Sequence, residues 1–378
     1  MNFKSKLLAA LILGIGTNGF TQLSDIRPVL TGAPFLRISP DARSGGMADQ
    51  GVATSPDVFS QFWNAAKYPF NHNTSSVGVS YTPYMNKLTN DVFLLYGSYF
   101  QFLGDEGRST ISTSIYYFSM GEVDLTQLVG NQITSNGAVK PNEFSFDAAY
   151  ALKLTDRYSM AVAGRYIRSD FGSFGSDSTL KPANSFAVDV SGYYKSEKFR
   201  SFGDYQGRIN AGWAIQNLGP KLDYTGDDES RSYLPTIARL GVGYDLFIDE
   251  QNRLSLSVEA TKLLVPGSEI TGYENGRPIN KVPNVGVMQG IGKSFNNKKS
   301  IMFSSALEYS FDDVFALRGG YFRESPEQGG RQFATAGIGF NYQSFGLDIS
   351  YLVNTSRINT TLDNTLRFGL TWNIGEKY

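Results

Sequence analysis

Strict alternation of apolar and polar side chains near the end of the sequence constrains the fold more than any other feature. Phe333 to Tyr342, Phe345 to Val353 and Thr365 to Ile374 each run for about ten residues, the length at which a tilted strand crosses a bilayer. In the last segment two faces separate completely: Leu366, Phe368, Leu370, Trp372 and Ile374 against Arg367, Gly369, Thr371 and Asn373. A period of two indicates strands with one apolar face, so these segments predict membrane-spanning β-strands.

Further segments upstream read as strands of the same kind. They are Val77 to Tyr84, Asp91 to Tyr99, Thr110 to Ser119, Glu143 to Leu154, Tyr158 to Arg168, Ser185 to Tyr194, Arg208 to Asn217, Thr236 to Asp245, Arg253 to Leu263, Ile301 to Ser310 and Val314 to Tyr321. The predicted fold is all-β: a transmembrane antiparallel β-barrel of about 14 strands over residues 77–378, because lipid tolerates no unpaired strand edge.

The lengths of the connections support an even strand count. Bacterial barrels alternate short periplasmic turns with long outer loops, and this chain does so only if Val285 to Ile291 lies inside a loop rather than forming a further strand. The expected outer loops are then residues 120–142, 169–184, 218–235, 264–300, 322–332 and 354–364. We therefore predict an outer-membrane protein with long loops at the cell surface.

The start of the sequence predicts export. Lys4 and Lys6 precede an apolar run from Leu7 to Ile15, and small residues follow near Thr21. This pattern is typical of a cleaved signal peptide, here residues 1–21. The net charge of −1 argues against a nucleic-acid partner, and the absence of cysteine excludes thiolate metal sites. No cofactor and no metal site are predicted.

Charged residues gather on the face of the strands opposite the apolar one. They are Asp147, Arg165, Asp189, Arg239, Glu259, Glu308, Arg318, Asp348 and Arg367. These charges could form a selectivity filter or a catalytic cluster, but we expect them to pair with one another and with an inserted plug. A cation on the lipid face would cost roughly 2–4 kcal/mol near the midplane, which explains their confinement to the lumen.

Residues 22–76 do not alternate and are predicted to form an N-terminal plug. A glycine-rich stretch is followed by a short helix that ends near Ala66. Its glycines either permit close backbone approach inside a packed plug or only shape turns. The candidate plug motif consists of Arg43, Gly45, Gly46, Met47, Asp49, Gly51, Trp63 and Asn64.

The runs Ala42–Ala53 and Trp63–Tyr68 resemble the plug signature of the PorV family, also called LptO. These are outer-membrane proteins of the Bacteroidetes type IX secretion system and are related to the FadL fatty-acid transporter barrels. The resemblance extends over the mature chain, including Gly290–Phe295 and Phe315–Phe322. One departure is Ala65, which stands where many relatives have proline.

The resemblance implies an adaptor or shuttle that is not an enzyme. Members of this family bind the C-terminal signal domains of secreted cargo, collect the cargo from a SprA/Sov-type translocon and deliver it to an attachment complex of the PorU sortase, PorQ and PorZ. The barrel itself would contact outer-membrane lipid. The fourteen strands of FadL-like barrels agree with the count reached from the connection lengths.

Apolar residues in the expected outer loops are candidate contacts for cargo or other partners. They are Leu125, Leu128, Phe171, Phe174, Leu264 and Val265. Apolar groups placed where water is expected often mark protein contacts. They could equally pack as lids between loops or reach the lipid interface.

Two other functions remain open from the sequence. The first is a FadL-like channel for hydrophobic small molecules. The second is a barrel enzyme of the lipid A deacylase type, which would depend on His72, the only histidine. No Gly-x-Ser-x-Gly elbow surrounds a candidate nucleophile, and a single histidine without cysteine cannot form a common metal triad. We expect no enzymatic activity.

Overall fold

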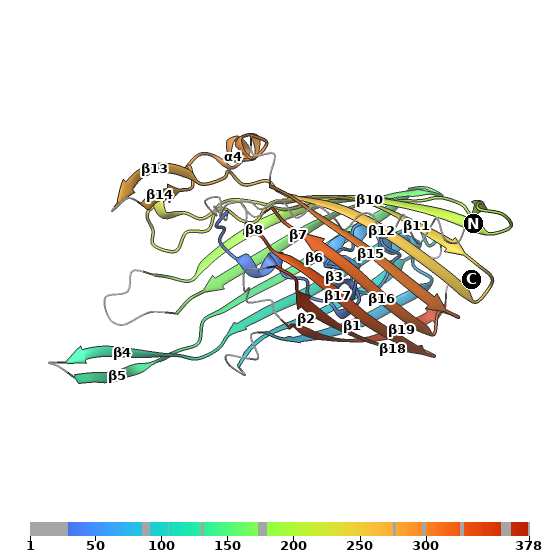
Figure 1. Ribbon diagram of the computed structural model, residues 1–378, viewed down its shortest axis with the longest axis horizontal. Coiled ribbons are helices and arrows are strands. Elements are labelled where there is room, and N and C mark those ends of the chain that lie inside the picture. Colours follow the sequence, from blue (N-terminus) through green and yellow to red (C-terminus); the bar gives the residue numbers. More distant parts are fainter. Residues whose placement is uncertain are drawn as a thin grey trace, which may run out of the picture.

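The computed structural model describes residues 29–84, 91–104, 106–129, 132–172, 180–274, 277–296, 300–325, 329–356 and 364–376. Fourteen long strands form a barrel around a short N-terminal segment that fills its interior (Figure 1). The proposed signal peptide, residues 1–21, lies outside the described residues and stays a prediction. No helix in the described part of the chain is long and apolar enough to cross a membrane.

Each barrel strand pairs with the next in an antiparallel sheet. The strands are β1 (Asn73–Pro83), β2 (Val92–Leu103), β3 (Ser109–Met120), β6 (Asn142–Thr155), β7 (Tyr158–Asp170), β8 (Ala183–Lys195), β10 (Gln206–Leu218), β11 (Ile237–Phe247), β12 (Asn252–Leu263), β15 (Ile301–Phe311), β16 (Phe315–Arg323), β17 (Gln332–Tyr342), β18 (Phe345–Asn354) and β19 (Leu366–Glu376). The pairing of β19 with β1 closes the circuit. The predicted strands match these within a few residues, so the closed 14-stranded barrel is confirmed.

The two faces of the strands separate as their alternation predicts. In β19, Leu370 and Trp372 are 61% and 51% exposed, whereas Arg367 near the start of the strand is 1% exposed. Trp372 pairs with Val77 of β1 and Phe345 of β18, so an apolar band continues from strand to strand. The outward face therefore suits lipid, and the inward face packs against the plug.

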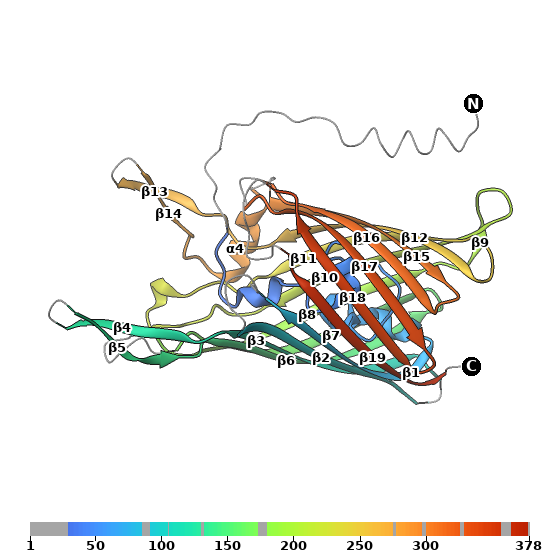
Figure 2. The same cartoon turned by 60° about the horizontal axis from the view of Figure 1, so that its bottom comes forward.

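The connections differ between the two ends of the barrel (Figures 1 and 2). At one end, called here the long-loop end, two hairpins project: β4 (Val123–Val129) with β5 (Gln132–Val139), and β13 (Glu269–Glu274) with β14 (Arg277–Lys281). Helix α4 (Val287–Ser294) and the short helix η3 (Asp228–Ser230) belong to the same end. The segment Val285 to Ile291 thus lies inside a loop, as predicted, and most of it is helical.

The opposite end, called here the short-turn end, has compact connections. Its exception is the segment after β8, which carries the two-residue strand β9 (Phe199–Arg200) paired with the start of β10. This hairpin extends beyond the neighbouring turns (Figure 2).

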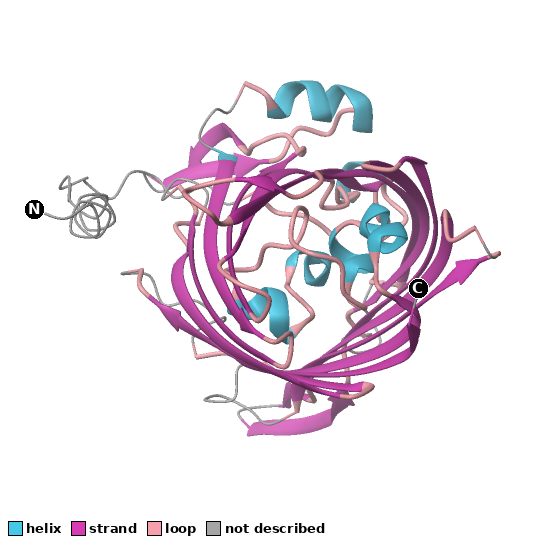
Figure 3. Cartoon of the chain, turned by 90° about the vertical axis from the view of Figure 1, so that its right-hand side faces the viewer, coloured by secondary structure: helices cyan, strands magenta, loops and turns pink. Residues whose placement is uncertain are grey.

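The plug crosses the lumen as a chain of short helices (Figure 3). These are η1 (Pro34–Arg37), α2 (Ala42–Gly46), α3 (Ser60–Trp63) and η2 (Ala65–Phe70). Phe59, Phe62 and Trp63 belong to one buried apolar cluster with Tyr96 and Tyr116 from the barrel wall. The plug therefore supplies the core that the inward face of a 14-stranded barrel would otherwise lack.

Candidate functional site

Arg43 joins the plug to the barrel wall. Its guanidinium pairs with Asp57 of the plug (Nη1 to Oδ2, 2.6 Å) and with Glu308 of β15 (Nη2 to Oε1, 3.2 Å). Arg318 of β16 holds the same Glu308 carboxylate at 2.6 Å. Ser55 accepts two more hydrogen bonds from Arg43, at 3.0 Å and 2.5 Å. Because separating these groups inside the lumen would leave buried charges without partners, the network holds the plug against this wall.

A second attachment uses the backbone of the glycine-rich stretch. The N–H groups of Gly51 and Val52 both donate to Oε2 of Glu259 at 3.0 Å. Arg239 pairs with the other carboxylate oxygen at 3.0 Å, and its guanidinium lies 4.9 Å from the ring centroid of Trp63. The carboxylate of Glu259 is thus held between the plug backbone and a barrel cation, which fixes its position and balances its charge.

The glycines of the plug motif serve close packing. A Cβ on Gly46 would lie 3.0 Å from the Cα of Gly337 in β17, and one on Gly51 would lie 2.4 Å from Cγ of Trp63. Gly45 faces side chains of β18 and β19 at similar distances. None of these three glycines has a positive φ. Close approach, rather than turn geometry, is therefore the reason for glycine at these positions.

The charged residues predicted to face the lumen are all paired. Arg165 holds both Asp147 and Asp189 at 3.0 Å, and Arg318 also pairs with Asp348 at 2.5 Å. Arg367 pairs with Asp49 of the plug at 3.1 Å. Together with the Arg239–Glu259 and Glu308 pairs, these contacts confirm the prediction that the lumen charges pair with one another and with the plug.

Titratable groups lie buried within the plug itself. Burial, reinforced by the neighbouring Asp57, raises the pKa of Asp41 to about 6, and Asp41 accepts a hydrogen bond from Trp63 Nε1 at 2.7 Å. Burial lowers the pKa of Lys67 to about 8. Burial alone would raise the pKa of Asp57, but the cations of Lys67 and Arg43 outweigh it and lower this pKa. The cavity beside Arg43 has a volume of only about 20 Å³, enough for a single water, so this network is a structural lock with no room for a substrate.

The structure brings the whole plug motif together. Met47 is 2% exposed, and Asn64 caps η2 while its side-chain amide donates to Val52 O at 2.9 Å and Gly192 O at 3.0 Å. Sequence reasoning missed Asp41, Asp57 and Lys67, which complete the network. Their sequence signal was weak, because charged residues in a segment without alternation read as solvent-exposed.

The candidate contact residues are mostly packed rather than exposed. Leu264 and Val265 are 6% and 3% exposed, and the Phe171 ring lies 5.2 Å from that of Tyr224. The expectation that Leu264 and Val265 present apolar groups to water is wrong, because the long connections fold back over the barrel mouth and bury them. They form the loop-on-loop packing that was the alternative. Phe171 and Leu125, which lies on β4, are half-buried.

The exposure of the other two candidates, Leu128 and Phe174, cannot be read from the described residues. Leu128 belongs to β4, and its side chain lies outside what the structure describes; Phe174 falls outside the described residues altogether. Their contact role stays a prediction.

Other apolar side chains are exposed at the long-loop end. Met288 of α4 is 72% exposed and Phe295 just after it is 60% exposed. Val123 of β4 and Ile279 of β14 are 41% and 45% exposed. Among the described strands, hairpins β4–β5 and β13–β14 pair only within themselves, so their edges are open to another strand. These features make the long-loop end the candidate interaction surface.

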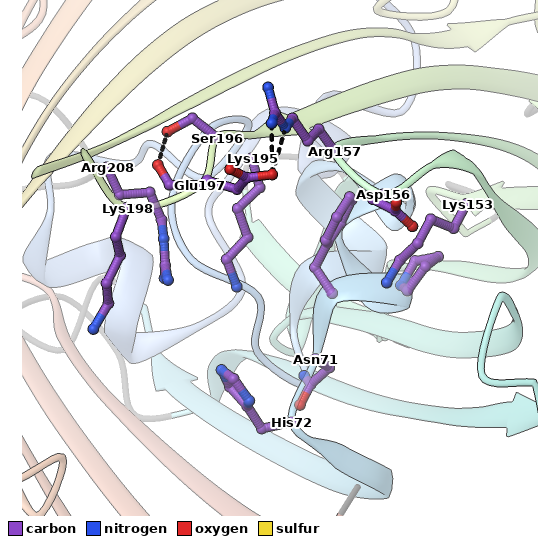
Figure 4. A pocket seen from close by; sticks show the side chains of 12 residues that line it. Asn71, His72, Lys153, Asp156, Arg157, Lys195, Ser196, Glu197, Lys198 and Arg208 are labelled. Carbon is purple, nitrogen blue, oxygen red and sulfur yellow. Dashed lines mark hydrogen bonds and ion pairs between the residues drawn. The ribbon is translucent and has the colours of Figure 1, made fainter. Parts of the chain in front are cut away.

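The single histidine lies at the opposite end. His72 follows η2 and lines a pocket at the short-turn end with several lysines and arginines (Figure 4). Among the described residues no group of three His, Cys, Asp or Glu side chains could hold a metal ion. The surroundings of His72 are cationic, since Lys153, Lys195 and Arg208 line the same pocket.

Comparisons with known proteins agree with the architecture. The chain is similar to the CymD monoaromatic hydrocarbon channel (9% identity, TM-score 0.50, 90% of this chain and 99% of that one). It is also similar to the Ralstonia pickettii toluene transporter TbuX (11% identity, TM-score 0.49, 90% of this chain and 98% of that one). A Pseudomonas aeruginosa FadL homologue is similar as well (11% identity, TM-score 0.46, 92% of this chain and 99% of that one). At this low identity, the similarity to CymD shows a shared fold only. Among curated proteins, nothing matches.

A family model shows the family of this chain, which the solved structures do not. The model described as type IX secretion system protein PorV matches residues 21–270, which include the plug and the strands from β1 to β12. That match covers more than half of the chain, and the barrel architecture agrees with an outer-membrane location. The chain therefore belongs to the PorV family of type IX secretion system proteins.

Proposed function

We propose that this protein is a surface adaptor of the type IX secretion system in a Bacteroidetes outer membrane. It binds the C-terminal signal domains of cargo, receives cargo from a SprA/Sov-type translocon and passes it to the PorU, PorQ and PorZ attachment complex. The match of the PorV family model to plug and barrel together carries this proposal. The long-loop end faces the cell surface, since bacterial barrels place their long loops outside.

The locked plug supports an adaptor over a channel. Three separate barrel carboxylate or guanidinium groups, those of Glu308, Glu259 and Arg367, bind plug residues. Moving the plug would break several buried ion pairs at once. An adaptor needs only a rigid barrel that presents its loops, whereas a channel for hydrophobic molecules needs a path through this packed interior.

The exposed features of the long-loop end are the proposed contact surface for cargo. Signal domains could pair with the open edges of hairpins β4–β5 and β13–β14 by strand addition. Met288 and Phe295 would add apolar contact beside β13–β14. Leu125 and Leu128 of β4 keep their place in this proposal, because their hairpin stands clear of the barrel (Figure 2).

Affinity purification from native outer membranes tests the adaptor role. We expect the wild-type protein to recover translocon and attachment components together with cargo. The double variant Met288→Ser/Phe295→Ser should recover cargo at least fivefold less well, since apolar hot-spot residues each contribute more than about 1 kcal/mol to an interface. Tyr342→Ser is the matched control, because Tyr342 is 62% exposed at the short-turn end. Recovery of the barrel with bound lipid and without secretion partners would contradict the adaptor role and favour the channel.

A further inference from the structure

A cationic pocket lies at the short-turn end, at the other end of the barrel from the proposed cargo surface. Figure 4 shows the residues that line it. Its volume is about 410 Å³. The exit of the plug, from Pro69 to His72, forms one side, and the ends of β6, β8 and β10 with their turns form the others. Its charged lining consists of Lys153, Asp156, Arg157, Lys195, Glu197, Lys198 and Arg208.

Cations outnumber acids in this lining by five to two. Glu197 is occupied by Arg157 at 2.5 Å. Among the described residues, neither Lys153 nor Lys195 forms an ion pair, and their ammonium groups lie 4.7 Å and 6.0 Å from the ring centroid of Phe70. The pocket therefore holds several positive charges that the protein itself does not neutralise.

Two further observations show the same excess of positive charge. Arg208 Nε is buried without a hydrogen-bond partner among the described groups, although buried donors are nearly always satisfied. Burial lowers the pKa of His72, and the cations of Lys195 and Arg208 lower it further. An anion placed in the pocket would supply a partner for Arg208 and offset the repulsion among the cations.

The pocket opens toward the lumen mouth and not toward lipid. Lys195 and Arg208 alternate along their strands with Tyr194 and Ile209, which are 36% and 40% exposed on the outer face. A membrane headgroup would approach from that outer face. The ligand must therefore come from the aqueous space at the short-turn end, which is the periplasm in bacterial barrels.

Aromatic side chains beside the pocket indicate what kind of anion it takes. Phe199, Phe202 and Tyr205 of the β9 hairpin are 40%, 71% and 44% exposed. A free phosphate would use only the cations, whereas a peptide can bring carboxylates to the pocket and apolar side chains to the hairpin. We propose that the short-turn end binds an acidic, aromatic-containing peptide segment of a periplasmic protein. This site is independent of the cargo surface at the other end of the barrel.

Fluorescence anisotropy on the full-length mature protein in detergent tests the proposal. The probe is a short fluorescein-labelled peptide of alternating aspartate and phenylalanine. We expect specific binding. Lys195→Met and Arg208→Met should each raise Kd about tenfold, because each cation donates a charge-assisted hydrogen bond to a peptide carboxylate. Lys140→Met removes the same charge at the long-loop end, where Lys140 is 77% exposed, and should leave Kd unchanged.

Further arms of the experiment separate the ligand classes. Unlabelled pyrophosphate and phosphatidylglycerol vesicles should each displace the peptide poorly. Phe202→Ser should weaken binding of the peptide, while heat-modified gel mobility confirms that each variant retains its barrel. Equal affinity for all variants, or no binding by the wild-type protein, would overturn the proposal. Pyrophosphate that displaces the labelled peptide at a lower concentration than unlabelled peptide does would overturn the peptide assignment in favour of a phosphate ligand.

Discussion

At the scale of single residues, Gly51 shows how closely the plug is packed. A Cβ at this position would lie 2.4 Å from Cγ of Trp63, whose indole is 1% exposed and cannot move aside. We therefore expect Gly51→Ala to destabilise the protein by about 1–3 kcal/mol, the range for overpacking a filled core. The midpoint of thermal unfolding in detergent, followed by gel mobility, measures the change.

A second glycine provides the control for this prediction. A Cβ on Gly164 in β7 would meet no heavy atom within 4 Å, and this glycine does not have a positive φ. Gly164→Ala should leave the unfolding midpoint nearly unchanged. Similar effects of the two substitutions would show that the plug is more loosely packed than the contacts around Gly51 indicate.

His72 reports directly on the cationic pocket. Burial and then the cations of Lys195 and Arg208 lower the pKa of its imidazole. Lys195→Met removes one of these cations, so the protonated imidazole becomes less unfavourable and the pKa of His72 should rise toward its ordinary value. His72 is the only histidine, so a single NMR resonance reports the titration. A pKa that stays the same or falls would argue against a positive potential in the pocket.

At the scale of elements, the contact between α2 and β15 depends on one guanidinium. Arg43→Met would leave the carboxylates of Asp57 and Glu308 without one of their cations in a buried site. The expected loss of stability is about 3–5 kcal/mol, as for removing one partner of a buried pair. Adding Asp57→Asn should restore part of that loss, because Arg43 is the only ion-pair partner of Asp57 among the described residues, whereas Glu308 keeps Arg318.

An exposed ion pair makes the matching control for Arg43. Arg200 pairs with Asp204 at 2.8 Å in the β9 hairpin, with side chains 78% and 97% exposed. Arg200→Met should cost at most about 1 kcal/mol. If denaturation in urea shows equal losses for the two arginines, the plug network does not hold the plug as proposed.

The elements differed in how well the sequence predicted them, for a physical reason. β19 and β12 were found because a strand with lipid on one side and packed lumen on the other must alternate. Hairpins β4–β5 and β13–β14 have no lipid face, so Leu125 and its neighbours carry no period of two and read as loop. The burial of Leu264 and Val265 depends on long connections folding back, which no local pattern encodes.

At the scale of the whole molecule, the plug and barrel form one unit whose charges match across the lumen. The sequence predicted that lumen charges would pair, since unpaired charges are not tolerated in such an interior. It could not predict which partners meet, such as Arg367 with Asp49, or that Lys153, Lys195 and Arg208 converge at the short-turn end. Those juxtapositions arise from strand pairing and from insertion of the plug, which bring residues far apart in sequence together.

Because the sequence has no cysteine, a single introduced disulfide can test whether the plug stays fixed in the barrel. A Cβ at Gly369 in β19 would lie 3.5 Å from the Cβ of Ala42 in α2, within the range that a disulfide bridges. Ala42→Cys/Gly369→Cys should therefore oxidise readily and tie the plug to the wall. Non-reducing gel mobility measures its formation, and Ala42→Cys alone is the control.

The disulfide-linked variant distinguishes an adaptor from a channel. An adaptor that presents its loops on a rigid barrel should recover cargo equally well in the oxidised and reduced states, because its contact surface lies outside the lumen. A channel would require the plug to move, so oxidation should block transport of a hydrophobic solute and reduction should restore it. Cargo recovery that falls on oxidation and returns on reduction would instead show that plug movement is part of the adaptor cycle, and the rigid barrel proposed here would be wrong.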